Sequence, residues 1–138
     1  IKYPEEMAAS KILRKRVLSP ETSKTVTRLL KSSIAESTAI AGKVPGYYVA
    51  GKTGTSRKPN PKGRGYLTDV YTSFVGYFPA DNPQVMMLVV VDSAKGGEVW
   101  GNTVAGPVFN NIAAKAARYL NIKQDKKLKE DEKLQARM

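Results

Sequence analysis

Residues 49–56 read Val-Ala-Gly-Lys-Thr-Gly-Thr-Ser, and two motifs that require different folds overlap in them. Gly46 to Thr53 fits the phosphate-binding pattern G-x-x-x-x-G-K-T letter for letter. That pattern needs a helix directly after its Lys-Thr pair, because the phosphates bind at the helix N-terminus. Residues 54–63 contain two prolines and two glycines, so they cannot begin a helix. The sequence therefore predicts a strand at 47–50 rather than a nucleotide-binding loop.

The segments around this strand predict a helix before it and two strands after it. Ser19-Pro20-Glu21 is typical of a helix start, and apolar residues recur at helical spacing as far as residue 36. Strands are predicted at 71–78 and 85–92, and the short Pro- and Asn-containing turn between them favours an antiparallel hairpin. Residues 86–91 are apolar without alternation, which predicts a strand covered on both faces.

The last regular element expected is a helix over residues 104–122, with Val108, Ile112, Ala116 and Tyr119 or Leu120 on one side. Residues 57–65 hold several prolines and glycines and are expected to be irregular. The predicted fold class is α/β, an antiparallel sheet flanked by helices. We expect residues 1–122 to be the C-terminal part of a larger domain, since three strands leave a sheet edge unpaired. Residues 123–138 are expected to form a charged extension.

Composition excludes several kinds of chemistry. The 138 residues contain no cysteine and no histidine, so disulfides, Cys/His zinc sites and a histidine general base are impossible within this chain. No metal and no cofactor is expected. The longest apolar run has seven residues, whereas a bilayer crossing needs roughly 20. Residues 1–6 do not have the composition of a signal peptide.

The charge is strongly positive and unevenly distributed. Lys and Arg number 23 against 12 acidic residues, a formal net charge of +11, and no acid occurs between Glu36 and Asp69. A basic chain favours an anionic partner, so a nucleic-acid-binding module is one alternative. Against it, Phe74, Tyr77 and Phe78 fall in an apolar strand rather than on an exposed basic face. We therefore expect no nucleic acid among the partners.

A second interpretation takes Lys52-Thr53-Gly54-Thr55 as the unit, and here the sequence resembles a known family. The tetrapeptide is similar to the K-T-G box of penicillin-recognising acyl-transferases. It is followed by Ser-Phe-Val-Gly-Tyr-Phe-Pro-Ala at 73–80 and by Trp-Gly-Asn-Thr-Val-Ala-Gly-Pro-Val-Phe at 100–109. This succession looks like the C-terminal part of the transpeptidase domain of class B penicillin-binding proteins, the D,D-transpeptidases of cell division and elongation. The resemblance covers roughly residues 20–122.

The resemblance implies a fold and a set of roles. The fold is the C-terminal portion of a serine β-lactamase-like domain, and the function is crosslinking of peptidoglycan stem peptides through a serine acyl-enzyme that β-lactams also acylate. It implies catalytic roles for Lys52, as a positive charge beside the nucleophile, and for the Thr55 backbone N–H, as an oxyanion donor. Substrate-binding roles fall to Thr53, Gly54, Thr55, Ser56 and Trp100.

Two motifs of that family are absent from the chain. No serine is followed by lysine three residues later, and none is followed by Asn or Asp two residues later. We therefore expect the chain alone to be inactive, with S-x-x-K and S-x-N supplied by an N-terminal remainder of the same protein. The implied partners are stem peptides, β-lactams and division or elongation proteins, at the extracytoplasmic face of the bacterial plasma membrane. A D,D-carboxypeptidase or β-lactamase-like acyl-hydrolase is the alternative inside the superfamily.

Overall fold

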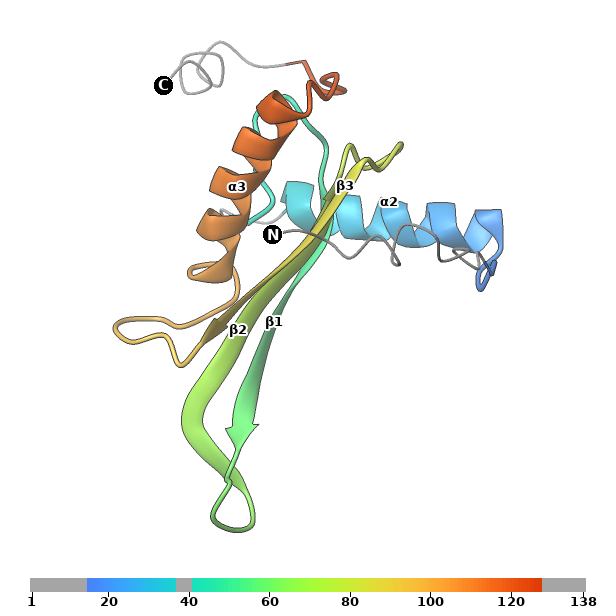
Figure 1. Ribbon diagram of the computed structural model, residues 1–138. Coiled ribbons are helices and arrows are strands. Elements are labelled where there is room, and N and C mark those ends of the chain that lie inside the picture. Colours follow the sequence, from blue (N-terminus) through green and yellow to red (C-terminus); the bar gives the residue numbers. More distant parts are fainter. Residues whose placement is uncertain (1–14, 37–40, 128–138) are drawn as a thin grey trace, which may run out of the picture.

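The computed structural model describes residues 15–36 and 41–127, which form two helices and one sheet. In chain order the elements are α2 (Pro20–Glu36), β1 (Ala50–Pro59), β2 (Tyr66–Phe78), β3 (Val85–Asp92) and α3 (Ala105–Tyr119). The strands form an antiparallel sheet in the order β1-β2-β3. Helix α3 lies against one side of the sheet and α2 on the other (Figure 1). The predicted fold class is confirmed.

Helix α2 begins as the sequence predicts and is held to the sheet by polar contacts. The Ser19 hydroxyl accepts a hydrogen bond from the Thr22 backbone N–H at 3.1 Å, which satisfies one of the free donors of the first turn. Farther along, the hydroxyls of Thr27 and Tyr77 lie 2.8 Å apart, and the Lys31 ammonium contacts the Asp81 carboxylate at 2.6 Å. No residue of α2 is buried in this chain.

The strand that carries Lys52 lies later in the sequence than predicted. It begins at Ala50, whereas residues 47–49 belong to the preceding turn and irregular segment, and it continues to Pro59 through residues expected to be irregular. Strand β2 likewise begins at Tyr66 instead of residue 71. Pro59 is tolerated because β1 is an edge strand, where a missing N–H need not break a ladder. The register of β1 against β2 shifts between Arg57 and Pro59, where the pairing of the two strands ends.

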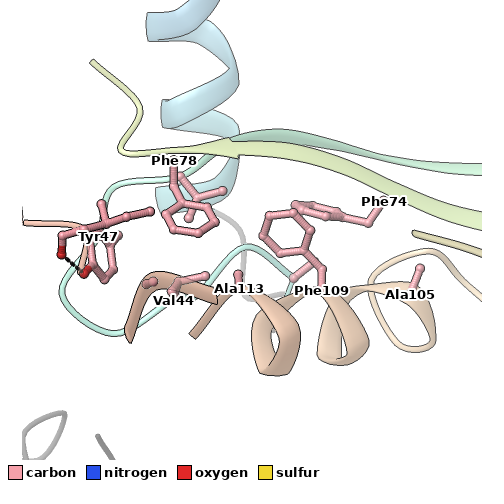
Figure 2. Packing of buried hydrophobic residues seen from close by; sticks show 11 residues of the cluster. Val44, Tyr47, Phe74, Phe78, Ala105, Phe109 and Ala113 are labelled. Carbon is pink, nitrogen blue, oxygen red and sulfur yellow. Dashed lines mark hydrogen bonds between the residues drawn. The ribbon is translucent and has the colours of Figure 1, made fainter. Parts of the chain in front are cut away.

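The core forms where α3 packs on the sheet. Phe74 and Phe78 of β2 are fully buried, and the Phe74 ring meets the Phe109 ring of α3 edge to face at a centroid distance of 4.6 Å (Figure 2). Gly76 makes this approach possible, because a Cβ there would come within 2.9 Å of the Phe109 ring. Two aromatic rings and a glycine thus fix the position of α3 over β2.

The buried side of α3 differs from the predicted one. Ala105, Phe109, Ala113 and Ala117 face the sheet, while Val108 and Ile112 are 42% and 46% exposed. The predicted helical spacing of apolar residues is confirmed, but the side with Val108 and Ile112 is not the buried one. Small alanines on the buried side let the helix axis come close to the strands, and the Phe109 ring fills the space between them.

The expectation that β3 is covered on both faces is wrong for this chain. Exposure alternates along β3, and the side chains of Met86, Leu88 and Val90 are 72%, 62% and 54% exposed. Their neighbours Val85, Met87, Val89 and Val91 pack against the core. One face of β3 is therefore an apolar surface with nothing over it in the described part of the chain.

The segment that follows α3 returns to the loop before β1. The Tyr47 hydroxyl donates a hydrogen bond to the Ile122 carbonyl at 2.6 Å (the dashed line in Figure 2), and the Gly46 carbonyl accepts from the N–H groups of Asp125 and Lys126. The domain boundary between residues 122 and 123 stays a prediction. Residues 128–138 of the predicted extension, like residues 1–14, lie outside the described residues. Neither described helix has the length and hydropathy that crossing a membrane requires.

Candidate active-site cleft

The K-T-G-T residues lie along a strand whose outer edge is free. Strand β1 pairs only with β2, so in the described part of the chain its other edge has no strand beside it. Alternate N–H and C=O groups of an antiparallel edge strand point outward. Such an edge can pair with an extended peptide backbone.

A cleft of about 290 Å³ opens beside this edge. It is bounded by β1, by the C-terminal part of α2 and by the loop before α3. Its lining consists of Ser33, Ile34, Ala41, Gly51, Lys52, Thr53, Thr55, Trp100, Gly101 and Asn102. Lys52 is the one charged side chain among them, so the cleft favours an anionic ligand.

Lys52 and Thr53 reach the cleft from opposite faces of the sheet. Lys52 lies directly opposite Val75, whereas Thr53 lies opposite the buried Phe74. Successive side chains of a strand point to opposite faces, so the cleft runs around the strand edge and receives both. The Lys52 side chain is exposed, and its ammonium donates to the Thr53 carbonyl at 3.1 Å.

Thr55 connects β1 to the loop before α3. Its hydroxyl oxygen accepts a hydrogen bond from the Gly101 backbone N–H at 3.3 Å. Gly101 lies so close to the sheet that a Cβ there would come within 2.5 Å of the Ser73 carbonyl oxygen and 2.8 Å of the Gly54 carbonyl oxygen. Only glycine permits this approach without a shift of the backbone.

The remaining predicted site residues are divided between the cleft and its surroundings. Trp100 lines the cleft and is 55% exposed, so it is not a buried loop residue. Gly54 lies within the strand, and a Cβ on it would come within 2.6 Å of the Ser73 hydroxyl, which would have to rotate away. Ser56 is exposed opposite Tyr71 and is not among the lining residues.

Basic residues beyond the cleft are partly neutralised. The Lys58 ammonium contacts the Asp92 carboxylate at 2.6 Å, and Lys95 contacts Asp69 at 3.1 Å. The hydrogen bond from Lys58 lowers the pKa of Asp92, and the one from Lys95 lowers the pKa of Asp69. These pairs lie toward the far end of the strands, and none of the residues that line the cleft beside Lys52 is acidic.

The geometry excludes one competing interpretation of the sequence and removes two aromatic residues from the other. Strand β1 continues through Thr53 to Pro59, so no helix follows the Lys-Thr pair and the phosphate-binding loop is ruled out. Phe74 and Phe78 are fully buried and are unavailable for stacking on nucleic-acid bases. Among the described residues, no group of three acidic side chains is placed to hold a metal ion.

Several lining residues were not predicted as site residues. Ser33 and Ile34 come from the last turns of α2, and Ala41 follows that helix, so only the folded chain brings them to β1. Gly101 and Asn102 directly follow Trp100, and this sequence neighbourhood was the one signal that pointed to them.

The chain matches the family model described as the penicillin binding protein transpeptidase domain over residues 1–114. The chain belongs to this family. Stage V sporulation protein D of Bacillus subtilis is 42% identical over 118 residues, which are 85% of this chain and 18% of that protein. Peptidoglycan D,D-transpeptidase FtsI of Escherichia coli is 31% identical over 111 residues, 80% of this chain and 19% of that protein.

Solved structures of penicillin-binding transpeptidase domains share the fold. The apo transpeptidase domain of penicillin-binding protein 3 from Burkholderia pseudomallei superposes with a TM-score of 0.72 at 38% identity, covering 82% of this chain and 34% of that one. Penicillin-binding protein 3 from Mycobacterium tuberculosis in complex with ampicillin gives 0.66 at 28% identity, covering 81% and 27%. The chain thus spans about a third or less of the relatives named here.

Proposed function

We propose that this chain is the K-T-G part of a peptidoglycan D,D-transpeptidase. The observation that carries the proposal is the placement of Lys52, Thr53 and Thr55 in one cleft at the free edge of β1, in a chain of the penicillin-binding transpeptidase family. In the complete protein a serine attacks the stem peptide and D-Ala leaves. The amine of a second stem then takes the acyl group and forms the crosslink.

The residues of the K-T-G-T segment have defined roles in the proposed reaction. The stem peptide ends in a carboxylate, which the Lys52 ammonium attracts and the hydroxyls of Thr53 and Thr55 bind. The same ammonium lies beside the nucleophile and biases its proton transfer. The Thr55 backbone N–H stabilises the oxyanion, a contribution of about 10²–10³ in rate for such donors. Gly54, Ser56 and Trp100 complete the substrate contacts at the rim.

The nucleophile is proposed to come from an N-terminal remainder of the same protein that carries S-x-x-K and S-x-N. The exposed apolar face of β3, formed by Met86, Leu88 and Val90, offers a surface on which that part can pack. The exposed apolar residues Val26 and Leu29 of α2 add to it. Without that part the chain is expected to be catalytically inactive.

The setting proposed for the complete protein is the extracytoplasmic face of the bacterial plasma membrane, with division or elongation proteins as its partners. Transfer to an amine is favoured over hydrolysis because matched relatives from Pseudomonas aeruginosa and Escherichia coli are named as peptidoglycan D,D-transpeptidases, the first of them as a probable one. Carboxypeptidase or β-lactamase-like activity remains the alternative. It predicts free peptide product in place of a crosslink.

Mass spectrometry after incubation with penicillin tests the proposal. The complete protein should gain one penicilloyl group, whereas the 138-residue chain alone should gain none. With a stem peptide and an amine acceptor, the complete protein should yield the crosslinked product in excess over the hydrolysed one. A complete protein that is not acylated would contradict the proposed function, and stoichiometric acylation of the 138-residue chain would contradict the assignment of the nucleophile to another part.

A further inference from the structure

The loop before α3 is organised by one hydroxyl group. The Thr103 hydroxyl oxygen accepts a hydrogen bond from the Trp100 backbone N–H at 3.1 Å and lies 2.7 Å from the Glu98 carbonyl, to which it donates. The Trp100 carbonyl in turn accepts from the N–H groups of Thr103 and Val104 at 3.1 and 3.0 Å. The Thr103 hydroxyl therefore bridges the backbone of residues 98 and 100, while its own side chain is exposed and outside the core.

This loop carries Trp100, Gly101 and Asn102 into the cleft. The backbone N–H and C=O of Trp100 are both bound by groups of residues 103 and 104, and Gly101 is the next residue in the chain. Gly101 is buried against Gly54 and Ser73 with no room for a side chain. The Gly101 carbonyl also accepts from the Gly106 N–H at 2.9 Å, which joins the loop to the first turn of α3.

The contact between the loop and β1 determines what the Thr55 hydroxyl can do. A hydroxyl has one proton to donate and two lone pairs that accept. The Gly101 N–H occupies one lone pair of Thr55 at 3.3 Å. Among the described residues no acceptor takes the Thr55 proton, so that proton is available to an acceptor in the cleft.

We propose that Thr103 is a positioning residue of the cleft, acting through residues 98–103 to place the Gly101 N–H on Thr55 and so to orient the Thr55 hydroxyl as a donor to the carboxylate of the substrate. This inference rests on the proposed function. Thr103 contacts no reacting group itself. Because it acts only through the Thr55 hydroxyl, its effect on the acylation rate is limited to ligands whose carboxylate accepts from that hydroxyl.

The test uses the complete protein with Thr103→Val, which has nearly the same shape but no hydroxyl, and Thr103→Ser, which keeps the hydroxyl. Thr25→Val on the exposed side of α2 is the matched control. The second-order acylation rate constant is measured with benzylpenicillin and with its methyl ester, which lacks the carboxylate. Melting temperatures are recorded for each variant.

Thr103→Val should lower the rate constant for benzylpenicillin by about three- to tenfold, the amount expected for one neutral hydrogen bond. The rate constant for the methyl ester should change by less than twofold. Thr103→Ser and Thr25→Val should acylate at the parent rates. The inference would be overturned if Thr103→Val had the parent rate constant for benzylpenicillin, or if it lost the same factor with benzylpenicillin and with the methyl ester. It would also be overturned if Thr103→Ser were slowed as much as Thr103→Val. Lys52→Ala is measured in parallel to separate this inference from the proposed function: a parent rate for Lys52→Ala would contradict the proposed function, whatever the result for Thr103→Val.

Discussion

The Asp125 carboxylate accepts a hydrogen bond from the Tyr48 backbone N–H at 2.9 Å, across 77 positions of the chain. Tyr48 lies two residues before β1 begins, and Asp125 lies six residues after α3 ends. Together with the bonds to the Gly46 carbonyl, this contact fastens the segment after α3 to the entrance of the strand that carries Lys52. The position of β1 thus depends on residues far beyond the K-T-G box.

Asp125→Ala should lower the melting temperature by a few degrees, because it removes a charge-assisted hydrogen bond that is itself exposed to solvent. Asp125→Asn keeps an acceptor oxygen and should lose less. Lys123→Ala, an exposed neighbour, serves as the control. Thermal unfolding followed by circular dichroism measures the differences. An Asp125→Ala variant that melts with the parent would show that the contact contributes nothing.

Thr72→Val should stabilise the protein. Thr72 is fully buried opposite Thr55, and its hydroxyl has no hydrogen-bond partner among the described residues. An unpaired buried hydroxyl costs about 1–3 kcal/mol, and valine has nearly the same shape. We expect a gain of about 1 kcal/mol in the free energy of unfolding, measured by urea denaturation. A clear loss of stability would mean that the hydroxyl has a partner in the complete protein.

The pair of Lys58 and Asp92 gives stability a defined pH dependence. The hydrogen bond from Lys58 holds the pKa of Asp92 below its ordinary value, and the same bond raises the pKa of Lys58. A lowered carboxyl pKa stabilises the fold above the ordinary value of about 3.9, and this contribution disappears as the pH falls through the lower, folded-state pKa. A raised lysine pKa contributes below its ordinary value and is lost only at strongly alkaline pH.

Asp92→Asn should therefore melt slightly below the parent between about pH 5 and 8. The difference should shrink as the pH falls below about 4, the ordinary aspartate pKa, and disappear once the pH is below the lowered pKa of Asp92 in the folded parent. Both carboxylate and ammonium are near solvent, so the difference is small at any pH. The measurement is the melting temperature of both proteins across the pH series. A difference in melting temperature that grows toward low pH would contradict a stabilising role of the Lys58–Asp92 pair.

Helix α2 and strand β3 could be predicted at their observed bounds because their local signals agree with the fold. The Ser19 cap and Pro20 define the start of α2, and the apolar run with turn residues on both sides defines β3. The course of β1 could not be predicted. Proline and glycine after Arg57 indicate irregular structure, and only pairing with β2 makes an extended edge strand of them.

Exposure was harder to predict than secondary structure. An apolar run such as β3 indicates burial, but the burial of Met86 and Leu88 depends on a layer that the described residues do not supply. The buried side of α3 follows from the fit of Phe109 between Phe74 and Gly76, a matter of shape that periodicity does not contain.

The part of the candidate site that could be predicted from the sequence is the K-T-G-T motif at residues 52–55. Lys52, Thr53 and Thr55 are close in sequence, and the structure brings Trp100 to them in the same cleft. The contact of Gly101 with Thr55 joins positions 46 residues apart, and no local pattern encodes it. Ser56 is adjacent to Thr55 in sequence, yet it is not among the residues that line the cleft.

The role of Lys52 is tested most directly by the second-order rate constant for acylation of the complete protein by benzylpenicillin, compared between the parent and Lys52→Ala. The lysine is exposed in the cleft and supports no core contact, so the melting temperature should not change. A charge-assisted hydrogen bond is worth roughly 1.5–3 kcal/mol, so its loss should slow acylation by about tenfold to over a hundredfold. Lys52→Arg should also be impaired, because a planar guanidinium does not replace a compact ammonium. Acylation of Lys52→Ala at the parent rate would contradict the assignment of the K-T-G box.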